Sequence, residues 1–146
     1  MAQASPIETL IEIAERETDD AAKRLGNAIR HQEEATGKLN LLLQYRDDYD
    51  AKFQASAANG LSASQYGNFL AFLNKLDTAV DGQRKIIEDA ENKVDAAKLE
   101  WQHCEKKRLS YNTLNKRSKQ LEQKKESKRD QKQTDEFAAR TYFYKS

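Results

Sequence analysis

The sequence predicts an all-α protein: a long antiparallel two-helix coiled-coil hairpin with an extended C-terminal helix. Apolar side chains recur with a 3.5-residue period in two runs, residues 11–53 and 66–111, and a short segment containing Gly and Ser separates them. Charged residues make up 34% of the chain and there is one proline, a composition typical of coiled coils. We predict a single coiled-coil domain over residues 1–146, with helix one at about 6–54, a tip loop at about 55–63 and helix two at about 64–140.

The first helix has a clear predicted start. Ser5 is suited to the N-cap, Pro6 to the first helical position, and Glu8 lies three residues after the cap, which together form a capping box. Ten of the 13 heptad positions a and d between residues 11 and 53 are apolar, and alanine occupies position d over four consecutive heptads. Because a methyl side chain lets two helix axes approach closely, this favours a paired hairpin over a larger open bundle.

The second helix follows a predicted turn. Gly60 can adopt the left-handed C-cap conformation, with Asn59 as the alternative, and Ser62 with Gln65 forms a second capping box. A short connection makes the two helices antiparallel neighbours. If Phe53 faces Tyr66, the two heptad patterns interdigitate along their length. The predicted coiled-coil core comprises Leu25, Leu39, Leu73, Val80, Ile87, Val94 and Trp101.

The C-terminal residues differ in character from the hairpin. The first helix runs out opposite about residue 113, so residues 114–146 have no partner in this chain. Residues 105–146 carry 13 Lys and Arg against 6 Asp and Glu, a net charge of +7 that leaves −6 for residues 1–104. Aromatic side chains return at Phe137 and at residues 142–144. These aromatics either bind a partner or remain exposed. Since acidic residues interrupt the basic ones regularly, the pattern favours a solvated helical face or a face for an acidic protein surface over nucleic-acid binding.

Several classes of function find no support in the sequence. It contains no phosphate-binding glycine loop, no paired His and no Cys cluster, so we predict neither catalytic residues, nor a metal site, nor a cofactor. Cys104 lies on the seam as a small apolar side chain, and a single cysteine fits a reducing cytosolic setting. No apolar stretch approaches the ~20 residues that span a bilayer, so we expect no membrane insertion. The N-terminal residues do not resemble a signal peptide.

The most distinctive local feature is a group of apolar residues near the predicted tip that lie off the seam. They are Leu41, Leu43, Tyr45, Leu70 and Phe72. A two-helix hairpin covers only one stripe of each helix. These side chains therefore form either the flank of a wide seam or an exposed patch that binds a partner, and the pattern alone leaves both interpretations open.

Three segments carry a resemblance to a known family. They are Asp20-Ala21-Ala22 with Leu25-Gly26 near the start, the tip residues Leu42, Tyr45, Tyr49, Gly60, Phe72, Leu76 and Ala79, and residues 130–138, DQKQTDEFA, in the tail. Over nearly its whole length the chain resembles the FliJ family of flagellar type III export proteins. The tail segment weighs most, because it is not a heptad pattern and heptads imitate one another.

The resemblance implies a specific role. The family forms an antiparallel coiled coil like the central stalk of rotary ATPases. Its terminal end inserts into the ring of the flagellar export ATPase hexamer and promotes ring assembly and activity, while its middle and tip contact the export-gate membrane protein and export chaperones. This implies a cytoplasmic protein, peripheral at the export apparatus of the inner membrane. Gln83 and Lys38 depart from the family's pattern within the gate-facing set.

The residues expected to make these contacts fall into two sets. The expected export-gate contacts are Leu42, Tyr45, Tyr49, Phe72, Leu76 and Ala79. The expected contacts with the ATPase ring are Lys124, Lys125, Lys128, Arg129, Asp130, Gln131 and Phe137. Two alternatives share the architecture: the equivalent stalk of a virulence-type III secretion system, and a purely structural coiled coil that self-associates.

Overall fold

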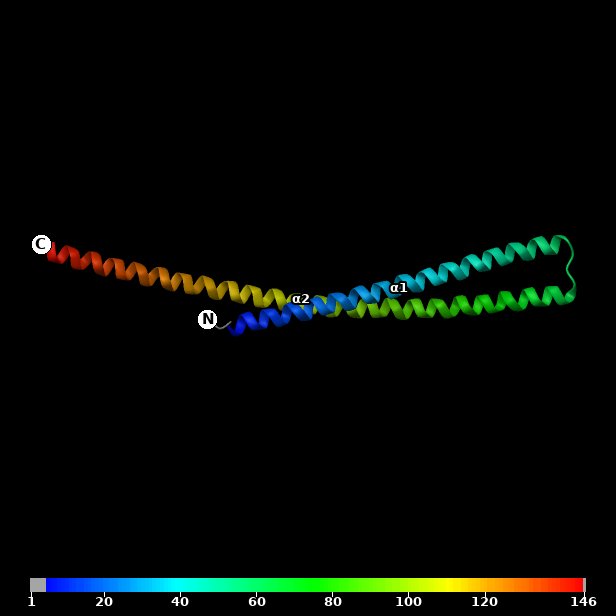
Figure 1. The fold of residues 1–146 in the computed structure, drawn as a ribbon, viewed down its shortest axis with the longest axis horizontal. Coiled ribbons are helices and arrows are strands. Elements are labelled where there is room, and N and C mark those ends of the chain that lie inside the picture. Colours follow the sequence, from blue (N-terminus) through cyan, green and yellow to red (C-terminus); the bar gives the residue numbers. More distant parts are fainter. Residues whose placement is uncertain (1–4, 146) are drawn as a thin grey trace. The chain divides into compact units, whose positions relative to one another are not determined.

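The computed structural model describes residues 5–145 as two long helices joined by a turn, α1 (Pro6–Ala58) and α2 (Ala63–Lys145) (Figure 1). The helices pack against each other in antiparallel order, and no strand occurs within the described range. The predicted all-α hairpin is therefore confirmed. The chain divides into two compact units, Met1–Asp19 with His103–Ser146 and Asp20–Gln102, which are described separately below.

Both helix starts have the capping boxes that the sequence predicts. The backbone N–H of Glu8 donates to Ser5 Oγ at 3.3 Å, and the N–H of Ser5 donates to Glu8 Oε2 at 3.4 Å. At the second start, the N–H of Gln65 donates to Ser62 Oγ at 3.2 Å and the N–H of Ser62 to Gln65 Oε1 at 3.1 Å. Each box satisfies backbone donors that the first turn of a helix leaves without an intrahelical acceptor.

The turn between the helices depends on Gly60. Its φ of 88° lies in the left-handed region, a backbone conformation that residues with a side chain adopt only at a cost. The N–H of Gly60 donates to the carbonyl of Ala57, and that of Asn59 to the carbonyl of Ser56, both at 3.2 Å. These bonds tighten the end of α1, which continues to Ala58, four residues beyond the predicted residue 54.

In the unit Asp20–Gln102, small and branched side chains line the seam between the helices. Ala21, Ala35, Leu76 and Val80 are buried, and Val80 is only 2% exposed. The other predicted core residues in this unit are half-buried: Leu25, Leu39, Leu73, Ile87, Val94 and Trp101. Two helices alone cover only a narrow stripe of each other, so most seam side chains keep an edge in solvent.

Polar contacts fix the axial register of the same unit. Gln83 Nε2 donates across the seam to the carbonyl oxygen of Ala35 at 2.9 Å. Arg24 and Glu100 form an exposed ion pair with a 2.5 Å contact. Exposed ion pairs stabilise a fold by little, and this one is more useful as a marker of which residues face each other.

Aromatic rings fill the closed end of the hairpin. The ring centroids of Phe53 and Tyr66 lie 5.8 Å apart, which agrees with the register the sequence predicts. Phe69 contacts both Tyr49 and Phe53, at 5.1 and 5.3 Å. Tilted and edge-to-face rings at such distances attract beyond the area they bury. A short turn alone would let the two helices move apart at this end. The aromatic cluster therefore holds them together there.

In the other unit, α1 and α2 pack through Ala14 and Thr18, which are both buried. The Thr18 hydroxyl donates to the carbonyl of Ala14 at 2.8 Å, so its polar group is satisfied. Arg108 occupies a seam position and pairs with Glu105 on the same helix. The hydrogen bond from Arg108 lowers the pKa of the Glu105 carboxyl, and the same bond raises the pKa of Arg108.

The packing against α1 ends well before α2 does. Asn115 is the last half-buried residue along the described part of α2, and residues 116–144 are exposed without interruption. A helix with no apolar face against a partner gains nothing from tertiary packing, which supplies most helix stability in water. This stretch is the tail discussed below.

Candidate functional site

Two surfaces are candidates for function: the closed end of the hairpin and the exposed tail of α2. At the closed end, the expected gate-contact residues separate into two layers. Leu42, Tyr49 and Leu76 lie on the seam, and Leu76 is only 8% exposed. Tyr45, Phe72 and Ala79 lie beside the seam and are exposed. We call these three exposed residues the tip surface. The seam residues pack between the helices beneath it.

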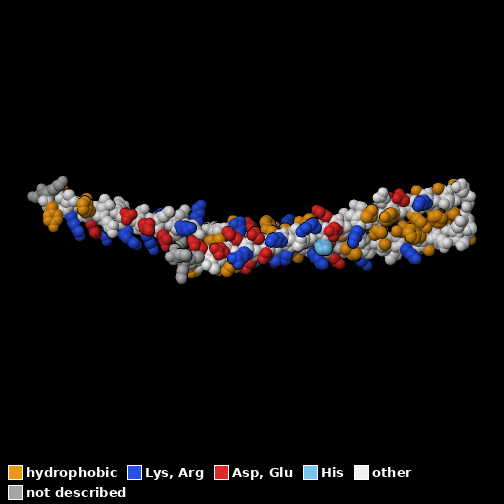
Figure 2. Space-filling model, in the orientation of Figure 1, with side chains coloured by type: hydrophobic (Ala, Val, Ile, Leu, Met, Phe, Trp, Pro, Cys, Tyr) orange, Lys and Arg blue, Asp and Glu red, His pale blue; other side chains and the backbone are white. Residues whose placement is uncertain are grey.

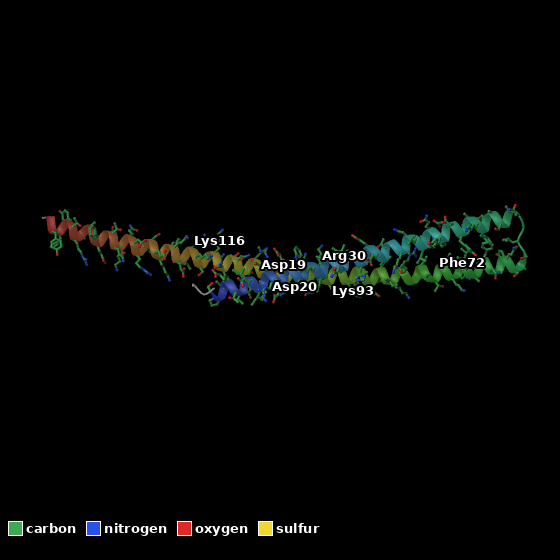
Figure 3. All side chains as sticks on the ribbon, in the orientation of Figure 1. Asp19, Asp20, Arg30, Phe72, Lys93 and Lys116 are labelled. Carbon is green, nitrogen blue, oxygen red and sulfur yellow. The ribbon has the colours of Figure 1, made fainter. Side chains whose placement is uncertain are left out.

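Phe72 has features of both arrangements that the sequence left open, the flank of a wide seam and an exposed patch. Its ring packs on Tyr49 with the centroids 4.3 Å apart, yet 43% of the residue remains exposed (Figure 3). Tyr45 is more exposed, at 59%. Hydrophobic side chains gather over this end of the hairpin on the face that Figure 2 shows. The seam therefore widens into an apolar surface that water still reaches.

The two positions outside the family pattern differ in their surroundings. Gln83 is half-buried, and its amide donates to the Ala35 carbonyl, so it belongs to the seam. Lys38 is exposed on the same side as Tyr45. Of the two, Lys38 is the one that a partner docked on the tip surface can contact.

The two sides of the hairpin differ in charge, a feature that the sequence analysis missed. On the side of Tyr45 and Phe72, the heptad positions next to the seam form what we call the lysine flank: His31, Lys38, Tyr45, Lys52, Phe72, Ala79, Ile86 and Lys93. Its charged members are lysines. The corresponding positions on the opposite side form the acidic flank: Ile29, Thr36, Leu43, Asp50, Leu70, Asp77, Arg84 and Glu91. Sorting the flanking positions by heptad letter would have revealed this difference from the sequence.

The tail contains all the residues expected to contact the ATPase ring, and all of them are exposed. They are Lys124, Lys125, Lys128, Arg129, Asp130, Gln131 and Phe137. Phe137 is 73% exposed, and Tyr142 and Tyr144 near the end of α2 are 78% and 91% exposed. Large aromatic side chains in water beside basic ones are typical of a segment that a partner covers.

The described residues contain neither a candidate membrane span nor a cluster of metal-ligating side chains. None of the helices there has an apolar stretch long enough to cross a membrane. Within residues 5–145, His, Cys, Asp and Glu side chains nowhere gather in a group of three or more that could hold a metal ion.

Comparison with known proteins agrees with the resemblance seen in the sequence. The family model described as "Flagellar FliJ protein" matches residues 3–146. A protein of Salmonella typhi named "Flagellar FliJ protein" is 32% identical over 140 residues, which cover 96% of this chain and 95% of that protein. A protein of the same name from Escherichia coli K12 is 29% identical over 140 residues, with the same coverage.

Proposed function

Because this chain belongs to the FliJ family of flagellar proteins, we propose that it is a non-catalytic stalk and adaptor of the flagellar type III export apparatus. The observation that carries the proposal is the continuation of α2 beyond its packing against α1: residues 116–144 are helical and exposed. An exposed helix end suits insertion into a narrow protein channel, where a partner surrounds it.

The tail is proposed to enter the ring of the export ATPase hexamer and to promote its assembly and activity. Residues 105–146 have a net charge of +7, and the exposed Lys124, Lys125 and Lys128 contribute to it. Basic side chains steer a protein towards an acidic channel lining and raise the association rate. Phe137 supplies an apolar contact within the same segment.

The direct test is co-purification of the full chain with the export ATPase, followed by assay of ATP hydrolysis. We expect the full chain to stimulate hydrolysis and a chain that ends after Lys116 to lose the stimulation. The shortened chain keeps each half-buried residue of the described helices, so circular dichroism and thermal unfolding should show an intact hairpin. Full stimulation by the shortened chain would rule out the tail as the ring-binding segment.

The tip surface is proposed to bind the export-gate membrane protein, and the middle and tip of the hairpin to bind export chaperones. Tyr45 and Phe72 are exposed aromatic residues, a type that dominates many interface hot spots. These contacts would hold a cytoplasmic protein at the inner-membrane export apparatus.

Tyr45→Ala is the cleanest variant for the gate contact, because Phe72 also packs on Tyr49. We expect Tyr45→Ala to weaken gate binding by roughly 1–3 kcal/mol while helix content stays the same. Leu70→Ala is the matched control, since Leu70 is 40% exposed at the same end but lies on the acidic flank. Equal losses from both variants would show that the flank does not matter and would contradict the assignment.

A further inference from the structure

A cavity opens between the helices, away from the closed end of the hairpin. Its volume is about 350 Å³, and it is lined by Ala28, His31, Ile86, Asp89, Ala90 and Lys93. Ala28 and Ala90 both occupy seam positions, and two methyl side chains at one level cannot fill the space that larger residues would. The cavity thus follows from the same small seam residues that let the helices approach.

The cavity and the tip surface lie on the same flank of the hairpin. Arg24 and Glu100 lie one heptad beyond the lysine flank on the same side of the hairpin, and their ion pair shows which residues face each other there. Moving one heptad at a time towards the closed end from this pair brings His31 opposite Lys93, then Lys38 opposite Ile86, then Tyr45 opposite Ala79. Ile86, which is 54% exposed, therefore lies at the edge of the cavity nearer the tip surface.

The charge along this strip indicates the chemistry of what covers it. From the cavity to the tip surface, the lysine flank holds Lys93 at the cavity, then Lys38, and no acidic residue, while Asp89 lines the cavity further from the seam. An apolar floor with a basic rim is complementary to a segment that carries a large apolar side chain flanked by carboxylates. The acidic flank across the seam would repel such a segment.

We propose that the gate-binding surface extends from Tyr45 and Phe72 along the lysine flank to this cavity, which receives a large apolar side chain from an acidic segment of the gate protein. The inference rests on the gate contact proposed above and adds the location of a second anchor and the chemistry of the partner segment. The cavity positions the apolar anchor, and Lys93 pairs with a carboxylate beside it.

Binding of the purified cytoplasmic part of the gate protein to the full chain, measured by calorimetry at low and high salt, tests this extension. We expect Ile86→Ala to weaken binding about fivefold at both salt concentrations, because it removes an apolar contact. Lys93→Glu should weaken binding about tenfold at low salt, with a smaller loss at high salt. The matched controls on the acidic flank are Ile29→Ala and Arg84→Glu. Both variants should bind the gate protein with an affinity within about twofold of that of the unmodified chain.

A variant that fills the cavity gives an independent measurement. Ala28→Leu places a larger side chain into the space beside Ala90, so thermal stability should not fall while gate binding weakens about fivefold. If Ala28→Leu, Ile86→Ala and Lys93→Glu all bind as tightly as the unmodified chain while Tyr45→Ala binds weakly, the extension is wrong and the tip contact stands. If Tyr45→Ala also binds normally, the proposed gate contact itself fails, and the extension fails with it.

Discussion

Gln83 shows how one side chain can specify a pairing that an apolar seam leaves loosely defined. Its Nε2 donates at 2.9 Å to the Ala35 carbonyl on the other helix, so sliding α2 by one heptad would break the bond. Apolar heptads alone allow such slippage at a modest loss of packing. A polar group on a seam commonly selects one register while lowering stability.

Replacing Gln83 separates its two effects. We expect Gln83→Leu to raise the free energy of unfolding by about 1 kcal/mol, because an apolar side chain gains more from this half-buried site than the amide does. Gln83→Ala should lower it by about 1 kcal/mol through lost packing and a lost hydrogen bond. Urea unfolding followed by circular dichroism measures both. A destabilised Gln83→Leu chain would show that the hydrogen bond outweighs apolar burial.

Val80 and Leu99 test which apolar residues hold the hairpin together. Val80 is 2% exposed and Leu99 is 68% exposed. Val80→Ala should cost about 2 kcal/mol, since it removes buried methyl groups and leaves a small void. Leu99→Ala should change stability by less than about 0.5 kcal/mol. The same urea titration measures both variants, and equal effects would contradict the observed seam.

At the scale of the elements, the turn between α1 and α2 places the strictest requirement on residue type, because the backbone conformation at Gly60 favours glycine. Gly60 has a φ of 88°, and beyond its two chain neighbours nothing lies within 4 Å of where its Cβ would be, so the obstacle to a side chain there is backbone strain and not space. Gly67 has equally open surroundings inside α2 but ordinary helical geometry. Gly60→Ala should therefore lower stability by about 1 kcal/mol. Gly67→Ala should raise it by about 0.5–1 kcal/mol, because alanine loses less backbone entropy in a helix. Thermal unfolding of the two variants should shift in opposite directions, and shifts in the same direction would refute the strain argument.

The helices and their starts could be predicted because local interactions determine them. Ser5 with Glu8 and Ser62 with Gln65 are three residues apart, and the heptad pattern fixes which face each helix buries. The end of α1 is predicted too early, because the break is placed from residue 55 onwards although residues 55–58 are Ala-Ser-Ala-Ala, and alanine favours the helix that continues through them. The ring geometry around Phe69 and the cavity beside Ala90 depend on side-chain volumes across both helices, which periodicity does not encode.

The candidate surfaces could be predicted only in part. The sequence identifies Tyr45 and Phe72 as apolar residues off the seam, but it does not say how far the Tyr49 ring covers Phe72. For Leu76, the sequence also did not predict the extent of burial. This residue belongs to the expected gate-contact set, but only 8% of it is exposed in the hairpin. Substitution of Leu76 would therefore test stability and binding together, which is why Tyr45 is the better probe.

For the molecule as a whole, the difference in net charge between the C-terminal residues and the rest of the chain predicts how salt affects binding. Residues 105–146 carry +7 and residues 1–104 carry −6. Reversing charge at Lys124, Lys125 and Lys128 should slow association with the ATPase ring and reduce its dependence on salt, with a smaller effect on dissociation. Stopped-flow or surface-based kinetics at two salt concentrations measures this. An unchanged association rate would show that these lysines do not steer the encounter.

The exposed tail also has a consequence for turnover in the cell. An unpacked helix opens readily, and proteases cut segments that open. Residues 116–144 carry many Lys and Arg side chains, each a cleavage site for a trypsin-like protease, and the described tail has no buried residue to resist opening. A chain whose tail is covered by its partner would survive digestion, and an uncovered chain would be trimmed back to the hairpin. The same stretch of helix can thus set the lifetime of copies that have not been assembled.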